Sequence, residues 1–107
     1  MGKSKVVQYR VRPEVADENQ RLVENVVAEF AAENPDGMRY AVFRLADGVS
    51  FVHIVHFDID DNGLSRSAAF AEFQRGFGDR VIGEPTADEA TLIGSYRFAG
   101  TAVSAHE

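Results

Sequence analysis

The residues in this sequence that are best suited to chemistry lie between Met38 and Asp58. His53 comes first, because an imidazole changes its protonation near neutral pH and can act as a general base or as a hydrogen-bond donor. Tyr40 can orient a substrate through its hydroxyl group, and Arg44 can bind a planar anion. We therefore take His53, Tyr40 and Arg44 as the candidate catalytic residues.

A β-hairpin is expected to position these side chains. Two runs rich in aromatic and β-branched residues flank Asp47-Gly48, and such a pair is typical of a two-residue type I′ turn. Side chains alternate along a strand, so this turn predicts one face with four cross-strand pairs. The pairs are Arg44 with Phe51, Val42 with His53, Tyr40 with Val55, and Met38 with Phe57.

Both faces of the predicted hairpin are largely apolar, so both are expected to be buried. We expect Phe43, Val52 and Ile54 to face two helices. The face that bears His53 would then meet a second subunit or a ligand, because a large bare apolar face marks an interface or a binding site. The candidate substrate-binding residues are Gln8, Arg10, Val42, Phe51, Val55 and Phe57.

The remaining elements predict an α+β fold with the order β-α-β-β-α-β. A strand is expected over residues 5–12, a helix after Pro13, and a second helix after a cap at Ser65 or Ser67. Residues 91–98 read as the last strand, and residues 80–89 as irregular because they contain Pro85. This order is typical of a ferredoxin-like unit, a four-stranded antiparallel sheet with two helices on one face. One domain spans residues 1–107, with its core at 5–98 and a tail at 99–107.

Composition excludes several classes of function. The chain has 107 residues, a net charge of −6 and no cysteine, so thiol chemistry is excluded and nucleic acid is not an expected partner. No apolar run approaches the roughly 18 residues that a membrane span requires, and the N-terminus lacks a signal-peptide pattern. We expect a cytoplasmic protein. Asp58, Asp60, Asn62 and Gly63 match half of a calcium loop, but Ala69 stands where the bidentate glutamate is needed, so no metal is expected.

Simpler structural roles stay open for the same side chains. His53 could be a hydrogen-bonded histidine inside a dimer interface, as buried polar groups require partners. His56 points to the opposite face, so the two histidines cannot form a chelating pair. Arg10, Arg44 and Arg97 could form ion pairs with the acidic helices instead of binding a ligand.

The pattern resembles the dimeric α+β barrel proteins, and within them the antibiotic-biosynthesis-monooxygenase-like domains. The likeness covers residues 5–98 and rests on KVVQYRV, ENQRLVENVVAEF, MRYAVFRLADGVSFVHIVHF, AAFAEFQRGF and TLIGSYRF. It implies a homodimer in which two sheets form a barrel. Many members carry a Trp near the end of the third strand, where Phe57 stands here, and a His in the second helix, which this chain lacks. Haem-degrading members use that His and a first-strand Asn, whose nearest analogue is Gln8, so haem is not an expected cofactor.

Two functions follow from the resemblance and the residues together. The first is a monooxygenase-like enzyme that acts without cofactor on a small aromatic or polyketide-like substrate, with His53 as base or donor. The alternative is a non-catalytic dimer that binds a small molecule or serves as an accessory protein.

Overall fold

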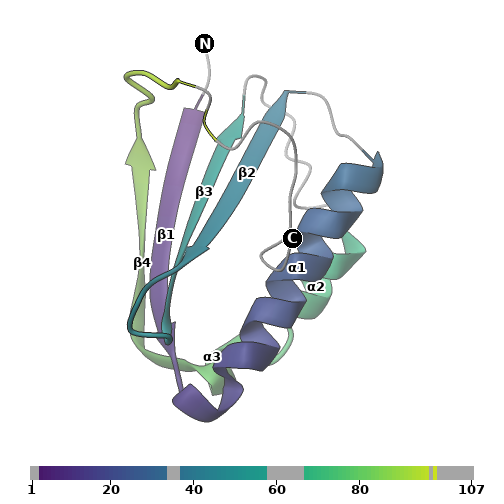
Figure 1. The fold of residues 1–107 in the computed structure, drawn as a ribbon, viewed down its shortest axis with the longest axis vertical. Coiled ribbons are helices and arrows are strands. Elements are labelled where there is room, and N and C mark those ends of the chain that lie inside the picture. The colour runs from purple at the N-terminus through teal and green to yellow at the C-terminus, as the bar shows by residue number, and fades with distance from the viewer. Residues whose placement is uncertain (1–2, 34–36, 58–66, 97, 99–107) are drawn as a thin grey trace.

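The protein is a four-stranded antiparallel sheet with helices on one side (Figure 1). The structure is a computed structural model, which describes residues 3–33, 37–57, 67–96 and 98. The strand order is β2-β3-β1-β4, so β2 and β4 are the edge strands. In chain order the elements are β1 (Lys3–Val11), η1 (Pro13–Val15), α1 (Ala16–Glu33), β2 (Met38–Arg44), β3 (Ser50–Phe57), α2 (Ala68–Gln74), α3 (Phe77–Arg80) and β4 (Val81–Ala90). The predicted ferredoxin-like α+β fold is confirmed.

The hairpin has the predicted register. Val42 lies opposite His53, Tyr40 opposite Val55, and Arg44 opposite Phe51. The turn itself differs from the predicted type I′ turn. Gly48 donates its backbone N–H to the Leu45 carbonyl at 2.9 Å, and Gly48 has a φ of 79°, a conformation that glycine adopts at no steric cost. The reverse turn therefore begins one residue earlier than predicted, and the strand pairing is unchanged.

The assignment of the two sheet faces was wrong. The face that carries His53 and Phe51 packs against the helices, whereas Phe43, Val52 and Ile54 lie on the outer face. Phe51 is 1% exposed and Phe43 is 43% exposed. The alternation in the sequence defined both sets of residues. It could not choose between them, because both sets are apolar.

The last strand was also placed wrongly. Residues 81–90 form β4, and residues 91–96 are neither helix nor strand. Pro85 is tolerated because β4 is an edge strand with an irregularity, where the register to β1 shifts between Gln8 and Arg10. Gly83 lies in this irregularity with a φ of 72°.

Both predicted helices are present. The chain leaves β1 through Pro13, which begins the short η1 turn before α1. Ser67 caps α2, because its Oγ accepts a hydrogen bond from the Phe70 N–H at 2.9 Å. Glu29 of α1 accepts hydrogen bonds from Ser67 and from the Ala69 N–H, which joins the two helices. Gly76 then separates α2 from α3.

None of the helices in the described part of the chain is long and apolar enough to cross a membrane. The half-match to a calcium loop at residues 58–63 and the predicted tail at 99–107 lie outside the described residues.

Candidate functional site

His53 lies between two tyrosine hydroxyl groups on the helix-facing side of the sheet. Its Nε2 is 2.7 Å from the Tyr9 hydroxyl oxygen, and its Nδ1 is 2.8 Å from the Tyr40 hydroxyl oxygen. The residue is 6% exposed. Both ring nitrogens are therefore engaged inside the protein.

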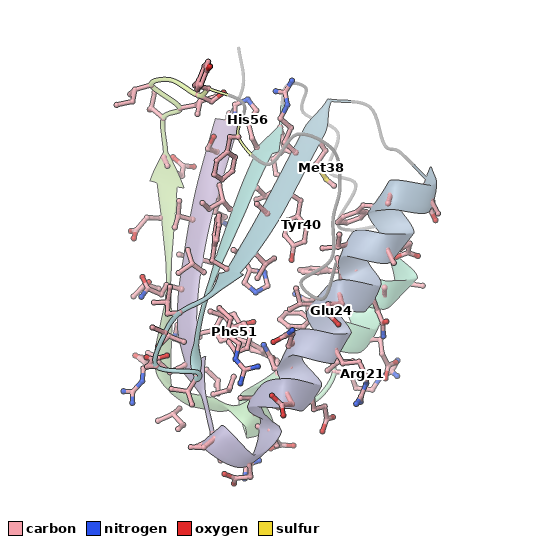
Figure 2. The ribbon with its side chains drawn as sticks, in the orientation of Figure 1. Arg21, Glu24, Met38, Tyr40, Phe51 and His56 are labelled. Carbon is pink, nitrogen blue, oxygen red and sulfur yellow. The ribbon has the colours of Figure 1, made fainter. Side chains whose placement is uncertain are left out.

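Strand register brings these three side chains together. Val7 and Val42 lie directly opposite His53 on the two neighbouring strands. Tyr9 follows Val7 by two residues, and Tyr40 precedes Val42 by two residues. Residues two apart share a face, so each tyrosine lies diagonal to His53, within reach of a long aromatic side chain. Tyr40 and Phe51 extend from the sheet toward α1 (Figure 2).

The hydrogen bonds continue from Tyr9 to a buried arginine. The Asn19 side chain donates from Nδ2 to the Tyr9 hydroxyl oxygen at 2.9 Å, and Arg80 donates from Nε to Asn19 Oδ1 at 3.1 Å. Arg80 also donates to the carbonyl oxygens of Phe73 and Arg75. We call Arg80, Asn19, Tyr9, His53 and Tyr40 the polar chain. It crosses the molecule from α3 through α1 to three strands.

Aromatic rings surround the polar chain. The Phe73 ring lies 5.5 Å from the His53 ring, and the Phe77 ring meets Tyr9 edge-on at 4.8 Å. Phe30 of α1 meets Tyr40 edge-on at 5.6 Å. Arg80 is 5.2 Å from the Phe73 ring centre, a cation–π distance. A buried cation is stabilised here by carbonyl oxygens and ring faces, and no carboxylate of the described residues pairs with it.

Burial sets the protonation of the site. It lowers the pKa of His53 to about 4, because the charged imidazolium would be poorly solvated. Burial also raises the pKa of Tyr9 to about 12, against a lowering by its hydrogen bond with Asn19 and by Arg80. The pKa of Tyr40 is raised as well, by burial first and by Tyr9 second. At neutral pH the imidazole and both phenols are therefore uncharged.

The predicted site residues fall into three groups. The first shares the helix-facing side with His53, namely Tyr40, Val42, Phe51, Val55 and Phe57. Gln8 and Arg10 form the second group, on the outer face with Val52, because they pair with Val52 and Ser50 of β3. The structure does not bring Gln8 or Arg10 to His53.

Arg44 forms the third group alone, at the hairpin end of the helix-facing side. Its Nη1 donates to Asp17 at 3.0 Å and to Gln20 at 2.7 Å, and its guanidinium lies 5.6 Å from the Phe51 ring centre. The ion pair with an acidic helix, which the sequence left open for this residue, is present.

Sequence reasoning did not select Asn19, Arg80 or Phe73 for this site. Asn19 could have been noticed, because it stands on the buried stripe of α1 with Ala16, Val23 and Val26. An amide on an apolar stripe needs a partner when it is buried. Arg80 carries no such signal, since it is the last residue of the short helix α3 in a stretch with several glycines.

The described residues contain no group of three or more His, Asp or Glu side chains placed to hold a metal ion. The polar chain has neutral oxygen and nitrogen atoms with one cation at its end. These groups can form hydrogen bonds, and protons can move between the hydroxyl and imidazole groups.

Fold and site together define an α+β protein of ferredoxin-like topology with a polar chain buried in an aromatic core. No protein-family model and no curated protein sequence matches the chain. Solved structures do match. Rv0793 from Mycobacterium tuberculosis has a TM-score of 0.71 at 16% identity, over 89% of this chain and 98% of its own.

Several of the further structures carry a functional name, and two of them serve as examples. A protein from Nitrosomonas europaea, named provisionally as an antibiotic biosynthesis monooxygenase, has a TM-score of 0.69 at 13% identity, over 94% of this chain and 93% of its own. One from Caulobacter crescentus with the same provisional name has a TM-score of 0.65 at 19% identity, over 87% and 91%. The predicted resemblance to antibiotic-biosynthesis-monooxygenase-like structures is confirmed at the level of the fold.

Proposed function

We propose that this protein is a monooxygenase-like enzyme that binds a small aromatic or polyketide-like substrate beside Tyr40 and His53. The polar chain carries this proposal. A hydrogen-bonded imidazole and two phenols, all uncharged at neutral pH, lie in an aromatic environment that suits a flat ligand with one or two oxygen atoms. The names of the structural neighbours support the same class of reaction.

The reaction needs no metal or flavin if the substrate supplies the electrons. An anthrone-type methylene group would lose its two hydrogens and become a carbonyl group, while O₂ gives one oxygen atom to that carbonyl and the other to water. The protein's part is to hold the substrate oxygen and to stabilise the enolate that forms when the first proton passes from carbon to water. The hydroxyl–imidazole pair of Tyr40 and His53 is the group assigned to that task.

Oxygen consumption with anthrone tests this function. His53→Ala should lower the rate by about 100-fold, the lower end of the range for removing a group that stabilises a developing oxyanion. The matched control is His56→Ala, because His56 lies on the outer face of the same strand, beside Ser4. Equal turnover by wild type and His53→Ala would show that the assigned role is wrong.

One observation favours a non-catalytic binder as the second candidate. Both nitrogens of His53 are occupied by tyrosine hydroxyls, and burial holds its pKa at about 4, so it is a weak base. A binder would show a rise in melting temperature with an aromatic ligand and no oxygen consumption.

We also propose that the protein is a homodimer, joined through the outer face of the sheet. Phe43 is 43% exposed there, and it lies beside Val52 on β3. Phe98 packs against Phe43 at 6.0 Å between ring centres, which extends the apolar surface. An open apolar sheet face of this kind favours association with a second copy.

Sedimentation at micromolar concentration tests the dimer. Wild type should sediment as two chains, and Phe43→Glu should shift it toward one chain because a charge would enter the interface. Ala28→Glu is the control, since it adds the same charge at an exposed position of α1. A single-chain species for wild type would refute the dimer.

A further inference from the structure

We infer that the polar chain has one direction, set by Arg80 and Asn19, and that it ends in a hydroxyl hydrogen of Tyr40 that binds an acceptor oxygen of the ligand. The inference deepens the proposed function, because it rests on a ligand bound beside Tyr40. It adds the tautomer of His53 and the positioning roles of Arg80 and Asn19, which the proposed function leaves open.

The first step is the orientation of the Asn19 amide. A guanidinium group can only donate, so the atom of Asn19 that lies 3.1 Å from Arg80 Nε must be the amide oxygen. The amide nitrogen then faces Tyr9, 2.9 Å from its hydroxyl oxygen. Arg80 is held in this position by the carbonyl oxygens of Phe73 and Arg75. The cation therefore determines which end of the amide Tyr9 meets.

The second step is the hydrogen of the Tyr9 hydroxyl. Its oxygen accepts from Asn19, so its hydrogen is available to His53 Nε2 at 2.7 Å. If Nε2 carried a hydrogen instead, the Tyr9 hydrogen would have no acceptor among the described residues, at a residue that is 4% exposed. Buried hydroxyl groups are rarely left in that state. Nε2 is therefore the acceptor.

The third step follows from the neutral imidazole, which has one donor and one acceptor nitrogen. Since Nε2 accepts, Nδ1 carries the hydrogen and donates it to the Tyr40 hydroxyl oxygen at 2.8 Å. The hydroxyl hydrogen of Tyr40 then has no acceptor within the polar chain, and the described residues give this hydroxyl no second partner. It is available to an acceptor atom of a ligand bound beside Tyr40, next to the Phe30 ring that meets Tyr40 edge-on.

This assignment gives the residues separate roles. Tyr40 would contact the ligand, whereas Arg80 and Asn19 are positioning residues that act through Tyr9 and His53. A ligand that can only donate would meet a hydrogen already in place, so the site discriminates by the direction of one hydrogen bond.

Asn19→Asp provides the test, because it is close to isosteric and should reverse the direction of the hydrogen bonds in the polar chain. A carboxylate accepts on both oxygens, so it would accept from Arg80 and from the Tyr9 hydroxyl. The Tyr9 oxygen would then accept from Nε2–H, and Nδ1 would accept from the Tyr40 hydroxyl. Asn25→Asp is the matched control, since it adds the same charge at an exposed position of α1.

Nitrogen-15 NMR of the histidine rings at pH 7 reads the result without any ligand. His53 should show a protonated Nδ1 in wild type and in Asn25→Asp, and a protonated Nε2 in Asn19→Asp. Loss of the signal in His53→Gln assigns it among the three histidines. A protonated Nε2 in wild type would overturn the inference.

Binding of 1-tetralone, an aromatic ketone, is compared with that of tetralin, which has the same rings without oxygen. Wild type should prefer the ketone by about fivefold, the worth of one neutral hydrogen bond, and Asn19→Asp should lose this preference. Equal preference in the two proteins would overturn the inference. If the tautomers are as expected but neither compound binds, the proposed function is wrong, and the inferred direction of the hydrogen bonds in the polar chain is still supported.

Tyr9→Phe keeps the test decisive if Asn19→Asp does not fold. It removes the donor to Nε2, so His53 should no longer hold a single tautomer. An unchanged protonated Nδ1 in Tyr9→Phe would show that Tyr9 and Asn19 do not set the direction.

Discussion

The two faces of the sheet are built from the same strands and differ in what covers them. Along β3, Phe51, His53 and Val55 are buried against the helices, whereas Val52 and Ile54 between them stay partly exposed. The helix-facing side holds the polar chain in an aromatic core. The outer face carries the apolar Phe43, Val52 and Ile54 beside the polar Gln8 and Arg10. A period of two residues thus separates the candidate chemistry from the candidate interface.

The largest expected effect contrasts two phenylalanines of the hairpin. Phe51→Ala should lower the free energy of unfolding by about 4 kcal/mol, because the large cavity cannot collapse in a packed core. Phe43→Ala on the outer face should cost less than about 1 kcal/mol at a protein concentration where the chain is monomeric. Urea unfolding of both variants measures the difference. Equal losses would mean that the two faces are not buried differently.

The buried cation is the next largest contributor. Arg80→Met should lower the free energy of unfolding by about 3 kcal/mol, because it leaves the Phe73 carbonyl and the Asn19 amide oxygen without their donors. Arg21→Met, on the exposed side of α1, should stay within about 0.5 kcal/mol of wild type. Urea unfolding at neutral pH measures both. A loss for Arg80→Met no larger than that for Arg21→Met would remove the energetic distinction between the polar chain and the surface.

The protonation of His53 predicts a dependence of stability on pH. Its pKa is about 4 in the folded protein and near 6.5 when unfolded, so between these values the unfolded chain binds more protons. The contribution of neutral His53 to the free energy of unfolding is therefore fully present above pH 6.5. It is lost as the pH drops toward 4, which lowers the free energy of unfolding by up to about 3 kcal/mol.

His53→Gln is the control for this titration, because glutamine keeps hydrogen-bonding atoms and does not titrate. Urea unfolding from pH 7 to 4 should show a shallower loss in this variant, while carboxylates such as Glu29 and Asp47, whose pKa values are lowered by their hydrogen bonds, contribute equally to both proteins. Parallel curves would show that His53 is not buried in its neutral form.

The smallest expected effect uses the same substitution on both faces of β3. Val55→Thr should lower the free energy of unfolding by about 1.5 kcal/mol, because it places a hydroxyl group in the core, where Val55 is 5% exposed. Val52→Thr on the outer face should change it by less than about 0.5 kcal/mol, since Val52 keeps access to water in a single chain. Thermal unfolding resolves the two. A larger loss at Val52 would indicate that the outer face is the more deeply buried one in solution.

Part of the candidate site followed from the sequence because it is local. The pairing of Tyr40 with Val55 and of Val42 with His53 depends on a short turn and on alternation, and both act over a few residues. Asn19 and Arg80 could not be paired in this way. They lie 61 residues apart, and only the packing of α3 against α1 brings their side chains together.

The position of the last strand was beyond local reasoning for a related cause. Pro85 argues against a strand wherever every backbone N–H must pair, and β4 escapes that rule because it is an edge strand with a register shift. Residues 91–98 carry the stronger strand pattern, yet residues 91–96 do not join the sheet. Sheet position, which is a tertiary property, decided between them.

By itself the sequence determined the order of the elements, the hairpin register and the two sets of residues on its faces. The physical reason is that strand alternation, helical periodicity and turn residues act locally. The tertiary structure alone decided which face the helices cover. Both faces are apolar, so covering Phe51 and His53 depended on how Phe30, Phe73 and Phe77 pack into the core on this side. That choice placed His53 between two tyrosines and joined it to Arg80.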